Sequence, residues 1–252
     1  MLKSNPAIGI KTGTINPVVG ECNDGYLNDI QGRHVNEEAV LQAISTAKSG
    51  RVLEGGVGAG TGMYCFHFKG GVGSSSRTVE HQGYTYTVGV LVVSNFGRRE
   101  ELVITGVPIG YELLDWSNQT RDKADDGSIM VILATDAPLS SRQLGRLARR
   151  VPLGLARTGS IASHGSGDFV IGFSTTHRLP HSSKKHRSNW ERIIDENEIM
   201  NMLFLATIET VEEAVLNSLF AAKTVVGRDG NTAYALPIEE VKEILIKYGR
   251  GE

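Results

Sequence analysis

Thr85-Tyr86-Thr87-Val88-Gly89-Val90-Leu91-Val92-Val93-Ser94 is the stretch of this 252-residue chain that most strongly predicts a β-strand. Its apolar residues run almost without a break from Val88 to Val93. Such a run is expected where other layers cover both faces of a sheet. A second run of this kind, Ser128 to Thr135, also indicates a buried strand, so a covered sheet is predicted.

The rest of the chain supplies further strands and several helices around this sheet. Helices are expected where apolar residues recur at helical spacing, and strands where they alternate or run together. Helices are expected from Asn36 to about Lys48 and over 140–151, 197–223 and 236–248. Further strands are expected over 63–68, 101–107 and 169–173. The helices cluster between sheet segments, which favours a layered α+β fold over a doubly wound sheet.

The helix expected at 140–151 has a basic polar face and a proline just beyond it. Pro152 lacks an amide donor, so it should end or kink the helix. The arginines are interpreted as a solvated face or a subunit contact. They are Arg142, Arg146, Arg149 and Arg150.

Composition limits the partners and the compartment. The net charge of −2 carries no basic signature, so nucleic acid is not an expected partner. No apolar run reaches membrane-spanning length, and no signal-peptide core follows Met1, so no membrane association is expected. Cys22 and Cys65 belong to no CxxC motif, which is typical of free thiols in a reducing compartment. We therefore expect a cytoplasmic protein with a single domain over residues 1–252.

Several common chemistries fail on spacing. The glycines at 55–62 match neither GxGxxG nor a P-loop, and the chain contains no GxSxG and no HExxH. The histidine- and lysine-rich segment 177–189 is interpreted as an exposed loop, with a metal or anion site as the alternative. No metal and no cofactor are therefore expected.

The serine of Gly165-Ser166-Gly167-Asp168 lies between two glycines just ahead of a strand-like run. A peptide bond with glycine on its acyl side is open to attack by the next residue's hydroxyl. Gly165-Ser166 is thus a candidate self-cleavage site, which would leave Ser166 as a new N-terminus carrying nucleophile and base. The alternative is a glycine-rich turn before a strand.

Other polar residues lie where they could assist such a serine. Asn95 follows the 85–94 strand, and its amide could donate to an oxyanion or belong to a strand-to-turn transition. Tyr26 is either a buried aromatic or a second donor. Thr207 and Glu209 lie in the apolar start of the 197–223 helix, where a carboxylate either faces solvent or steadies an amine or hydroxyl.

Ordered segments along residues 15 to 235 together carry a specific resemblance. They are Gly20–Asp29, Val57–Met63, Phe68–Gly73, Val88–Val92, Asn95–Gly97, Gly106–Gly110, Ala134–Leu139, Leu155–Gly159, Gly165–Asp168 and Gly172–Thr175. On these segments the chain is identified as a member of the DmpA/BapA family, the L-aminopeptidase/D-esterase and β-peptidyl aminopeptidase enzymes.

The resemblance implies a four-layer αββα sandwich similar to N-terminal-nucleophile hydrolases. It implies autocatalytic cleavage into residues 1–165 and 166–252, and an oligomer of such two-chain units. Ser166 would attack the acyl carbon at the N-terminus of a short peptide, amide or ester, with its freed α-amine as general base. The resemblance implies no cofactor.

The resemblance also suggests roles for individual residues. Asn95 would be the oxyanion donor, with Tyr26 as the weaker candidate. Thr207 and Glu209 resemble the hydroxyl and carboxylate pair that supports the nucleophile. The adjacent Glu212 and Glu213 compete for that carboxylate role. Glu54 would bind the ammonium group of the substrate.

Two features depart from the family. Its members usually carry a substantial N-terminal segment with sheet strands before the region that resembles 15–29, and without those strands the sandwich would expose an edge or a bare apolar face. The alternative function is therefore an inactive or truncated fragment that serves as a structural or interaction domain. His164 stands where a small polar residue is usual, and its imidazole could affect cleavage.

Overall fold

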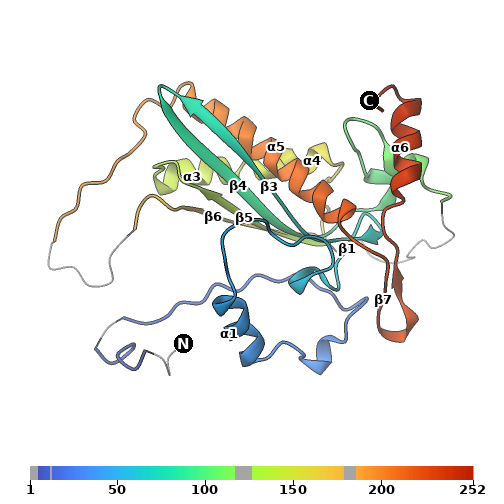
Figure 1. Cartoon of the computed structure of the whole chain (residues 1–252), viewed down its shortest axis with the longest axis horizontal. Helices are drawn as coiled ribbons and strands as arrows, with labels where there is room; N and C mark the ends of the chain where they lie inside the picture. Colours follow the sequence, from blue (N-terminus) through green and yellow to red (C-terminus); the bar gives the residue numbers. More distant parts are fainter. Residues whose placement is uncertain (1–4, 12, 117–126, 179–185, 252) are drawn as a thin grey trace.

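A computed structural model of the chain describes residues 5–11, 13–116, 127–178 and 186–251 (Figure 1). The helices are α1 (Glu37–Ser45), α2 (Ile109–Glu112), α3 (Ser141–Ala148), α4 (Val151–Arg157), α5 (Ile199–Phe220) and α6 (Ile238–Lys247). The strands are β1 (Tyr64–Cys65), β2 (Phe68–Lys69), β3 (Gly71–His81), β4 (Tyr84–Asn95), β5 (Ser128–Thr135), β6 (Gly167–Ser174), β7 (Val225–Val226) and β8 (Thr232–Ala233).

Four strands form the central sheet in the order β3-β4-β5-β6. The first two neighbouring pairs are antiparallel, and β5 and β6 are parallel. The connection between β5 and β6 contains α3 and α4, as a parallel pair requires a crossover. In register, Asn95 lies opposite Ser128 and Ser128 opposite Gly167, so the end of β4 and the starts of β5 and β6 meet at one end of the sheet.

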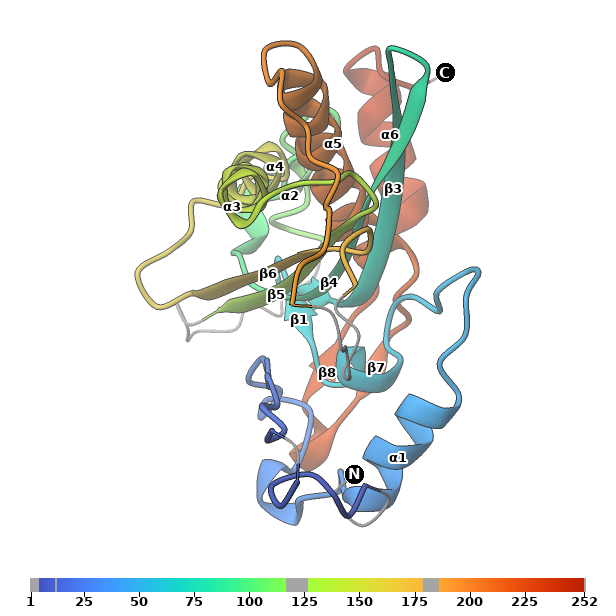
Figure 2. The same cartoon turned by 90° about the vertical axis from the view of Figure 1, so that its left-hand side faces the viewer.

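Helix α5 covers one face of this sheet and runs along β3 and β4 (Figures 1 and 2). Alternate residues of β4, Val88, Val90 and Val92, are buried beneath it. Gly73 on β3 permits the close approach, because a Cβ at that position would lie 1.9 Å from the Ala214 carbonyl oxygen of α5. This face holds most of the hydrophobic core.

The opposite face is covered less completely. The segment around Gly20 and Cys22 lies against Met130 of β5, but Phe169 and Phe173 of β6 are 62% and 45% exposed. In the part of the chain that the structure describes, no strand pairs with the outer edge of β6. Among the described residues, the outer edge of β6 and the apolar face that carries Phe169 and Phe173 are therefore exposed.

The predicted strand at 63–68 is wrong: this segment folds into the β1–β2 hairpin. Phe66 and His67 form its turn with φ of 50° and 59°, the left-handed conformation that both central residues of a type I′ turn require. Non-glycine residues seldom adopt it. The turn buries Phe66 against Phe96, with ring centroids 5.0 Å apart.

The predicted strand at 101–107 is also wrong, because the apolar run turns back on itself. Thr105 and Gly106 have φ of 50° and 81°, and Ile104 and Val107 exchange two backbone hydrogen bonds across them. Strand β3 was not predicted at all. Its middle, Ser74-Ser75-Ser76-Arg77, has no apolar alternation, although β3 pairs with β4 along its whole length.

The helical segment around Pro152 divides as predicted, but the chain beyond the break is helical too. Helix α3 ends at Ala148, and α4 begins at Val151 with Pro152 in its first turn, where the missing N–H costs nothing. Helices α1, α5 and α6 lie within the predicted segments. The Asn36 side chain accepts the Ala39 N–H at 3.0 Å, which caps α1.

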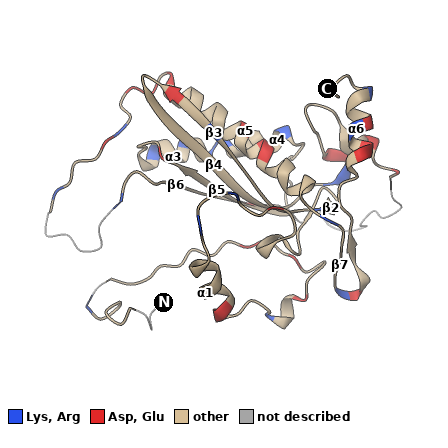
Figure 3. Cartoon of the chain, viewed as in Figure 1, with Lys and Arg blue, Asp and Glu red and all other residues tan. Residues whose placement is uncertain are grey.

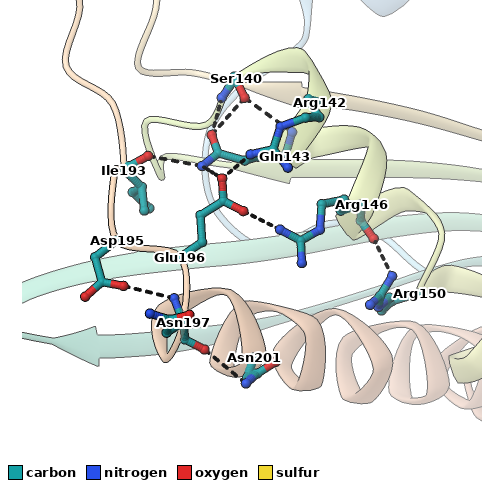
Figure 4. Close-up of polar contacts among 10 residues, drawn as sticks. All are labelled: Ser140, Arg142, Gln143, Arg146, Arg150, Ile193, Asp195, Glu196, Asn197 and Asn201. Carbon is teal, nitrogen blue, oxygen red and sulfur yellow. Dashed lines mark hydrogen bonds and ion pairs between the residues drawn. The ribbon is translucent and has the colours of Figure 1, made fainter.

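The arginines of this basic face combine solvent exposure with internal contacts, since the Arg142 side chain is 65% exposed and the Arg146 side chain 32%. Arg142 and Arg146 both bind the Glu196 carboxylate, which also accepts a hydrogen bond from Gln143 at 3.0 Å (Figure 4). Arg150 stacks over the Phe204 ring at 3.8 Å from its centroid. Arginines on and just after α3 therefore hold Glu196, which precedes α5, and Phe204 of α5 against this part of the chain.

Charged side chains gather on the helices and loops, and the core strands are nearly free of them (Figure 3). Strands β4 and β5 contain none. Residues 179–185 of the predicted basic loop lie outside the described residues. Among the residues that are described, no helix combines the length and apolarity needed to cross a membrane.

Candidate active site

The Gly165–Ser166 peptide bond lies in a tight turn immediately before β6. The Ser166 N–H donates to the Ser163 carbonyl at 2.8 Å, which closes the turn, and the Gly167 N–H donates to the Gly127 carbonyl at 2.9 Å, which begins the pairing with β5. Ala162, just upstream, has a φ of 49°, a conformation that costs a non-glycine residue about 1 kcal/mol. The bond is therefore presented at the end of the sheet where β4, β5 and β6 meet.

An open cavity of about 940 Å³ lies at this end of the sheet. Four residues predicted as site residues line it: Gly165, Ser166, Asn95 and Tyr26. They come from the turn before β6, the end of β4 and the loop before α1, so only the tertiary structure brings them together. A cavity of this size suits a short peptide.

Ser166 is half-buried, and its hydroxyl donates to the Asp168 Oδ1 at 2.6 Å. The two residues are separated by Gly167 in an extended segment, so their side chains lie on the same side of the chain. Sequence reasoning assigned no role to Asp168. The i, i+2 spacing in an extended segment was the available signal.

Asn95 is almost buried and forms three hydrogen bonds. Its Oδ1 accepts the Tyr64 N–H at 3.0 Å, and its Nδ2 donates to the Asn23 carbonyl at 3.1 Å and to the Ser128 Oγ at 3.3 Å. The side chain thus holds the β1 hairpin and the loop before α1 on the end of the sheet. Donation to an oxyanion would replace one of the two Nδ2 contacts, of which the Ser128 contact is the longer.

Tyr26 lies in the cavity wall with its ring 5.2 Å from the Tyr64 ring, between centroids. Its hydroxyl donates to the Thr232 carbonyl at 3.4 Å, and its own carbonyl accepts the Asn231 Nδ2 at 2.8 Å. These contacts link the loop before α1 to the β7–β8 hairpin. Tyr26 thereby shapes the cavity, and its hydroxyl is engaged with the backbone.

The structure does not bring Glu54 into the cavity lining. Its Oε1 accepts both the backbone N–H and the hydroxyl of Ser74 on β3, at 2.7 and 2.8 Å. Ser74 is in register with Leu91, which lies in the interior of β4 and not at the strand end beside Ser166. Glu54 therefore joins the glycine-rich loop to the sheet.

Thr207 and Glu209 also lie away from Ser166 in this structure. Thr207 is fully buried, and its hydroxyl donates to the Leu203 carbonyl within α5 at 2.8 Å. Glu209 forms an ion pair with Arg77 of β3 at 3.3 Å. The alternatives are engaged as well, since Glu213 pairs with Arg77 at 2.5 Å and Glu212 with Arg157 at 3.1 Å.

Charged and polar side chains that sequence reasoning missed also line the cavity. Both signs of charge are represented, so the lining could contact both ends of a short peptide. The residues are Glu21, Asp29, Tyr64, His67, Arg98, Glu101, Ser128 and Arg228. In the described ranges, no three His, Cys, Asp or Glu side chains gather where they could hold a metal ion.

Two ionisable groups lie buried in the β1–β2 hairpin. Lys69 is fully buried, and its Nζ donates to the Gly60 and Gly70 carbonyls at 2.7 Å each. Burial lowers the pKa of Lys69 to about 8 and raises the pKa of Cys65 to about 12. The lysine therefore ties the glycine-rich loop at 55–62 to the β1–β2 hairpin.

Comparison with known sequences gives a family. The pattern of Peptidase family S58 matches residues 1–233. The Beta-peptidyl aminopeptidase BapA of Sphingosinicella microcystinivorans is 46% identical over 246 residues, which are 93% of this chain and 62% of that protein. The chain thus spans less than two thirds of the length of this relative.

Solved structures agree with the sequence match. The PH0078 protein from Pyrococcus horikoshii OT3 is 52% identical with a TM-score of 0.90, over 99% of this chain and 67% of that one. The L-aminopeptidase D-Ala-esterase/amidase from Ochrobactrum anthropi, described as a prototype for the serine aminopeptidases and a new variant among the Ntn hydrolase fold, is 39% identical with a TM-score of 0.82, over 91% of this chain and 62% of that one. These matches confirm the predicted fold class, of which the described residues supply a helix layer and a central sheet.

Proposed function

The chain belongs to Peptidase family S58, and from this premise we propose that it is a self-processing serine aminopeptidase or amidase. Cleavage between Gly165 and Ser166 would yield residues 1–165 and 166–252. The observation that carries the proposal is the position of this bond, in a tight turn at the wall of a 940 Å³ cavity.

In the processed protein, Ser166 is the N-terminal residue and its Oγ attacks the acyl carbon of the substrate. The α-amine released by cleavage takes the hydroxyl proton, because an α-amine with a pKa near 8 transfers protons effectively at neutral pH. Asn95, at the end of β4, is the proposed oxyanion donor. A hydrogen bond to the developing charge is worth more in the transition state than in the ground state.

The proposed substrates are short peptides, amides or esters with a free N-terminus. The relatives support this class, one being a β-peptidyl aminopeptidase and another an L-aminopeptidase and D-Ala-esterase/amidase. The carboxylates of the cavity wall, Glu21, Asp29 and Glu101, are available to a substrate ammonium group. We propose that the processed units assemble as a homo-oligomer. The buried free thiols of Cys22 and Cys65 support a cytoplasmic location.

Mass spectrometry of the purified protein under denaturing conditions tests this function. The expected masses are those of residues 1–165 and 166–252, and the protein should release p-nitroaniline from p-nitroanilides of α- or β-amino acids. Ser166→Ala should yield the intact chain and no hydrolysis. An intact wild-type chain under all conditions, or hydrolysis by the Ser166→Ala variant, contradicts the proposal.

A second candidate function, a non-catalytic interaction domain, is favoured by one observation: the exposed face of β6 with Phe169 and Phe173. An apolar face of this kind is a docking surface or an aggregation site. Phe173→Thr, at the end of β6 distant from Ser166, should reduce binding of an apolar dye without changing p-nitroanilide hydrolysis. An uncleaved wild-type chain that nevertheless binds a protein partner through this face would favour the second function.

A further inference from the structure

The uncleaved chain lacks the base that the processed protein would use. Before cleavage, the nitrogen of Ser166 belongs to a peptide bond, and its N–H donates to the Ser163 carbonyl at 2.8 Å. A peptide nitrogen cannot accept the proton of the attacking hydroxyl. If the chain processes itself, another group must take that proton in the first cleavage.

Asp168 is placed to do so. Its Oδ1 accepts a hydrogen bond from the Ser166 hydroxyl, with 2.6 Å between the two oxygens. This short distance is typical of a hydrogen bond from a hydroxyl to a carboxylate. Asp168 is held in register opposite Ile129 of β5, so its carboxylate does not depend on a free loop for its position. Within the described ranges it forms no ion pair, and its charge is not committed to a cation.

Two histidines lie in the neighbourhood and are the rival bases. His164 belongs to the same turn as Ser166, and His67 lines the cavity with its ring stacked on Tyr64. The contact that the Ser166 hydroxyl makes in the structure is with Asp168. The geometry therefore favours the carboxylate over either imidazole.

We infer that Asp168 is the general base for self-cleavage of the Gly165–Ser166 bond, an inference that rests on the proposed function. The Ser166 Oγ–H proton passes to the Asp168 Oδ1 as the Oγ forms a bond to the Gly165 carbonyl carbon and the carbonyl electron pair moves onto oxygen. As the carbonyl reforms, the carbon–nitrogen bond breaks and the nitrogen receives the proton from Asp168.

The product of this transfer is an ester that joins the Gly165 carbonyl to the Ser166 Oγ, with a free α-amine on Ser166. Water then hydrolyses the ester, which yields the Gly165 carboxylate and restores the Ser166 hydroxyl. Asp168 returns to its starting ionisation state after the transfer. It thus acts on the precursor, while the released α-amine acts on later substrates.

Cell-free synthesis of the full chain, followed in time by mass spectrometry, tests the inference. Asp168→Asn should cleave about 100-fold more slowly than wild type, the effect of removing a general base. Asp168→Glu, which keeps the carboxylate, should cleave faster than Asp168→Asn. His164→Asn and Asp195→Asn should cleave within about threefold of wild type, the latter as a matched loss of a carboxylate elsewhere.

Hydroxylamine shows whether a variant fails at the acyl transfer or at the later ester hydrolysis, because it cuts an ester and leaves a peptide bond intact. The Asp168→Asn chain should stay whole after denaturation in hydroxylamine. A hydroxylamine-sensitive ester in that variant would place Asp168 in ester hydrolysis and overturn the inference. Adding formate to the Asp168→Ala chain separates a catalytic role from a structural one, because formate can replace a missing base but not a missing structural contact. The cleavage rate should rise with formate concentration. A cleavage rate that formate leaves unchanged contradicts the inference.

The outcomes separate this inference from the proposed function. A wild-type chain that never cleaves contradicts both. A wild-type chain that cleaves, together with an Asp168→Asn chain that cleaves at the same rate, overturns the inference alone. Loss of cleavage in His164→Asn with retention in Asp168→Asn would assign the base to the imidazole instead.

Discussion

Arg77 of β3 and Glu209 of α5 form an ion pair, with 3.3 Å between the Arg77 Nε and the Glu209 Oε2. The register links Arg77 to Val88, and through β4 and β5 to Ser174 at the far end of β6. At about 3.3 Å per residue, this end of β6 lies roughly 23 Å from Gly167. The pair therefore fastens α5 to the sheet at the end opposite to Ser166.

Replacing Glu209 distinguishes this structural position from the supporting role that the family resemblance suggests. Because both side chains of the ion pair are more than a third exposed, Glu209→Gln should lower the free energy of unfolding by less than about 1 kcal/mol. From its position, it should change p-nitroanilide hydrolysis less than about threefold. A 100-fold loss of hydrolysis with an unchanged melting temperature would show that Glu209 acts on Ser166 in the processed protein.

Asn95→Ala should affect both stability and catalysis. It removes the acceptor for the Tyr64 N–H and leaves that backbone group unpaired, which costs about 1–3 kcal/mol in urea unfolding. It also removes the proposed oxyanion donor, so kcat should fall about 100-fold. Ser128→Ala, which removes only one of the Asn95 partners, is the control and should lower kcat far less than Asn95→Ala does. A normal kcat in Asn95→Ala would remove Asn95 from the mechanism.

Lys69 should make stability depend on pH in the alkaline range. Burial lowers its pKa to about 8 in the folded state from the ordinary value of 10.5. The unfolded chain therefore binds more protons between pH 8 and 10.5, and this group's contribution to stability rises with pH across that window. The unfolding free energy of wild type minus that of Lys69→Met, measured in steps from pH 7.5 to 9, should increase as the pH rises. A difference that does not vary with pH contradicts the prediction.

Glu196 should stabilise the contact between α3 and the start of α5 above its titration range. Burial opposes ionisation of this carboxyl, but Arg142 and Arg146 outweigh it and lower the pKa of Glu196. Its contribution is thus present above the pKa of the unfolded chain and is lost as pH falls through the lower pKa of the folded state. Glu196→Gln should melt below wild type at neutral pH, and the two melting curves should converge in acid. Equal melting temperatures at neutral pH would contradict this.

Sequence patterns were sufficient where an element is long and periodic. The segments predicted at 85–94 and 128–135 are β4 and β5, and the apolar stripe at 197–223 contains α5. Sequence patterns were misleading where a backbone turn interrupts an apolar run or where a strand consists mainly of polar residues. The left-handed φ of Phe66 and His67 folds an alternating run into a hairpin, and the serines of β3 conceal a strand that only its pairing with β4 reveals.

The candidate site was predictable only in part for a similar reason. Gly165 and Ser166 are informative by themselves, because an exposed serine after glycine is a local chemical feature. Whether Asn95, Tyr26, Glu54 or Glu209 lies near them depends on strand register and on which end of the sheet each residue occupies. In this structure Asn95 and Tyr26 line the same cavity as Ser166, while Glu54 and Glu209 have partners elsewhere on β3.

Neighbouring residues in the sequence are enough to identify the candidate scissile bond Gly165–Ser166, the apolar strands β4 and β5 and the family resemblance, since each of these is a local pattern. Only the fold brings residues from distant parts of the chain to the serine. The register of β4 with β5, and of β5 with β6, brings Asn95 to the end of the sheet that carries Ser166. Contacts between residues distant in the chain follow from hydrogen-bond register and packing, which no local pattern encodes.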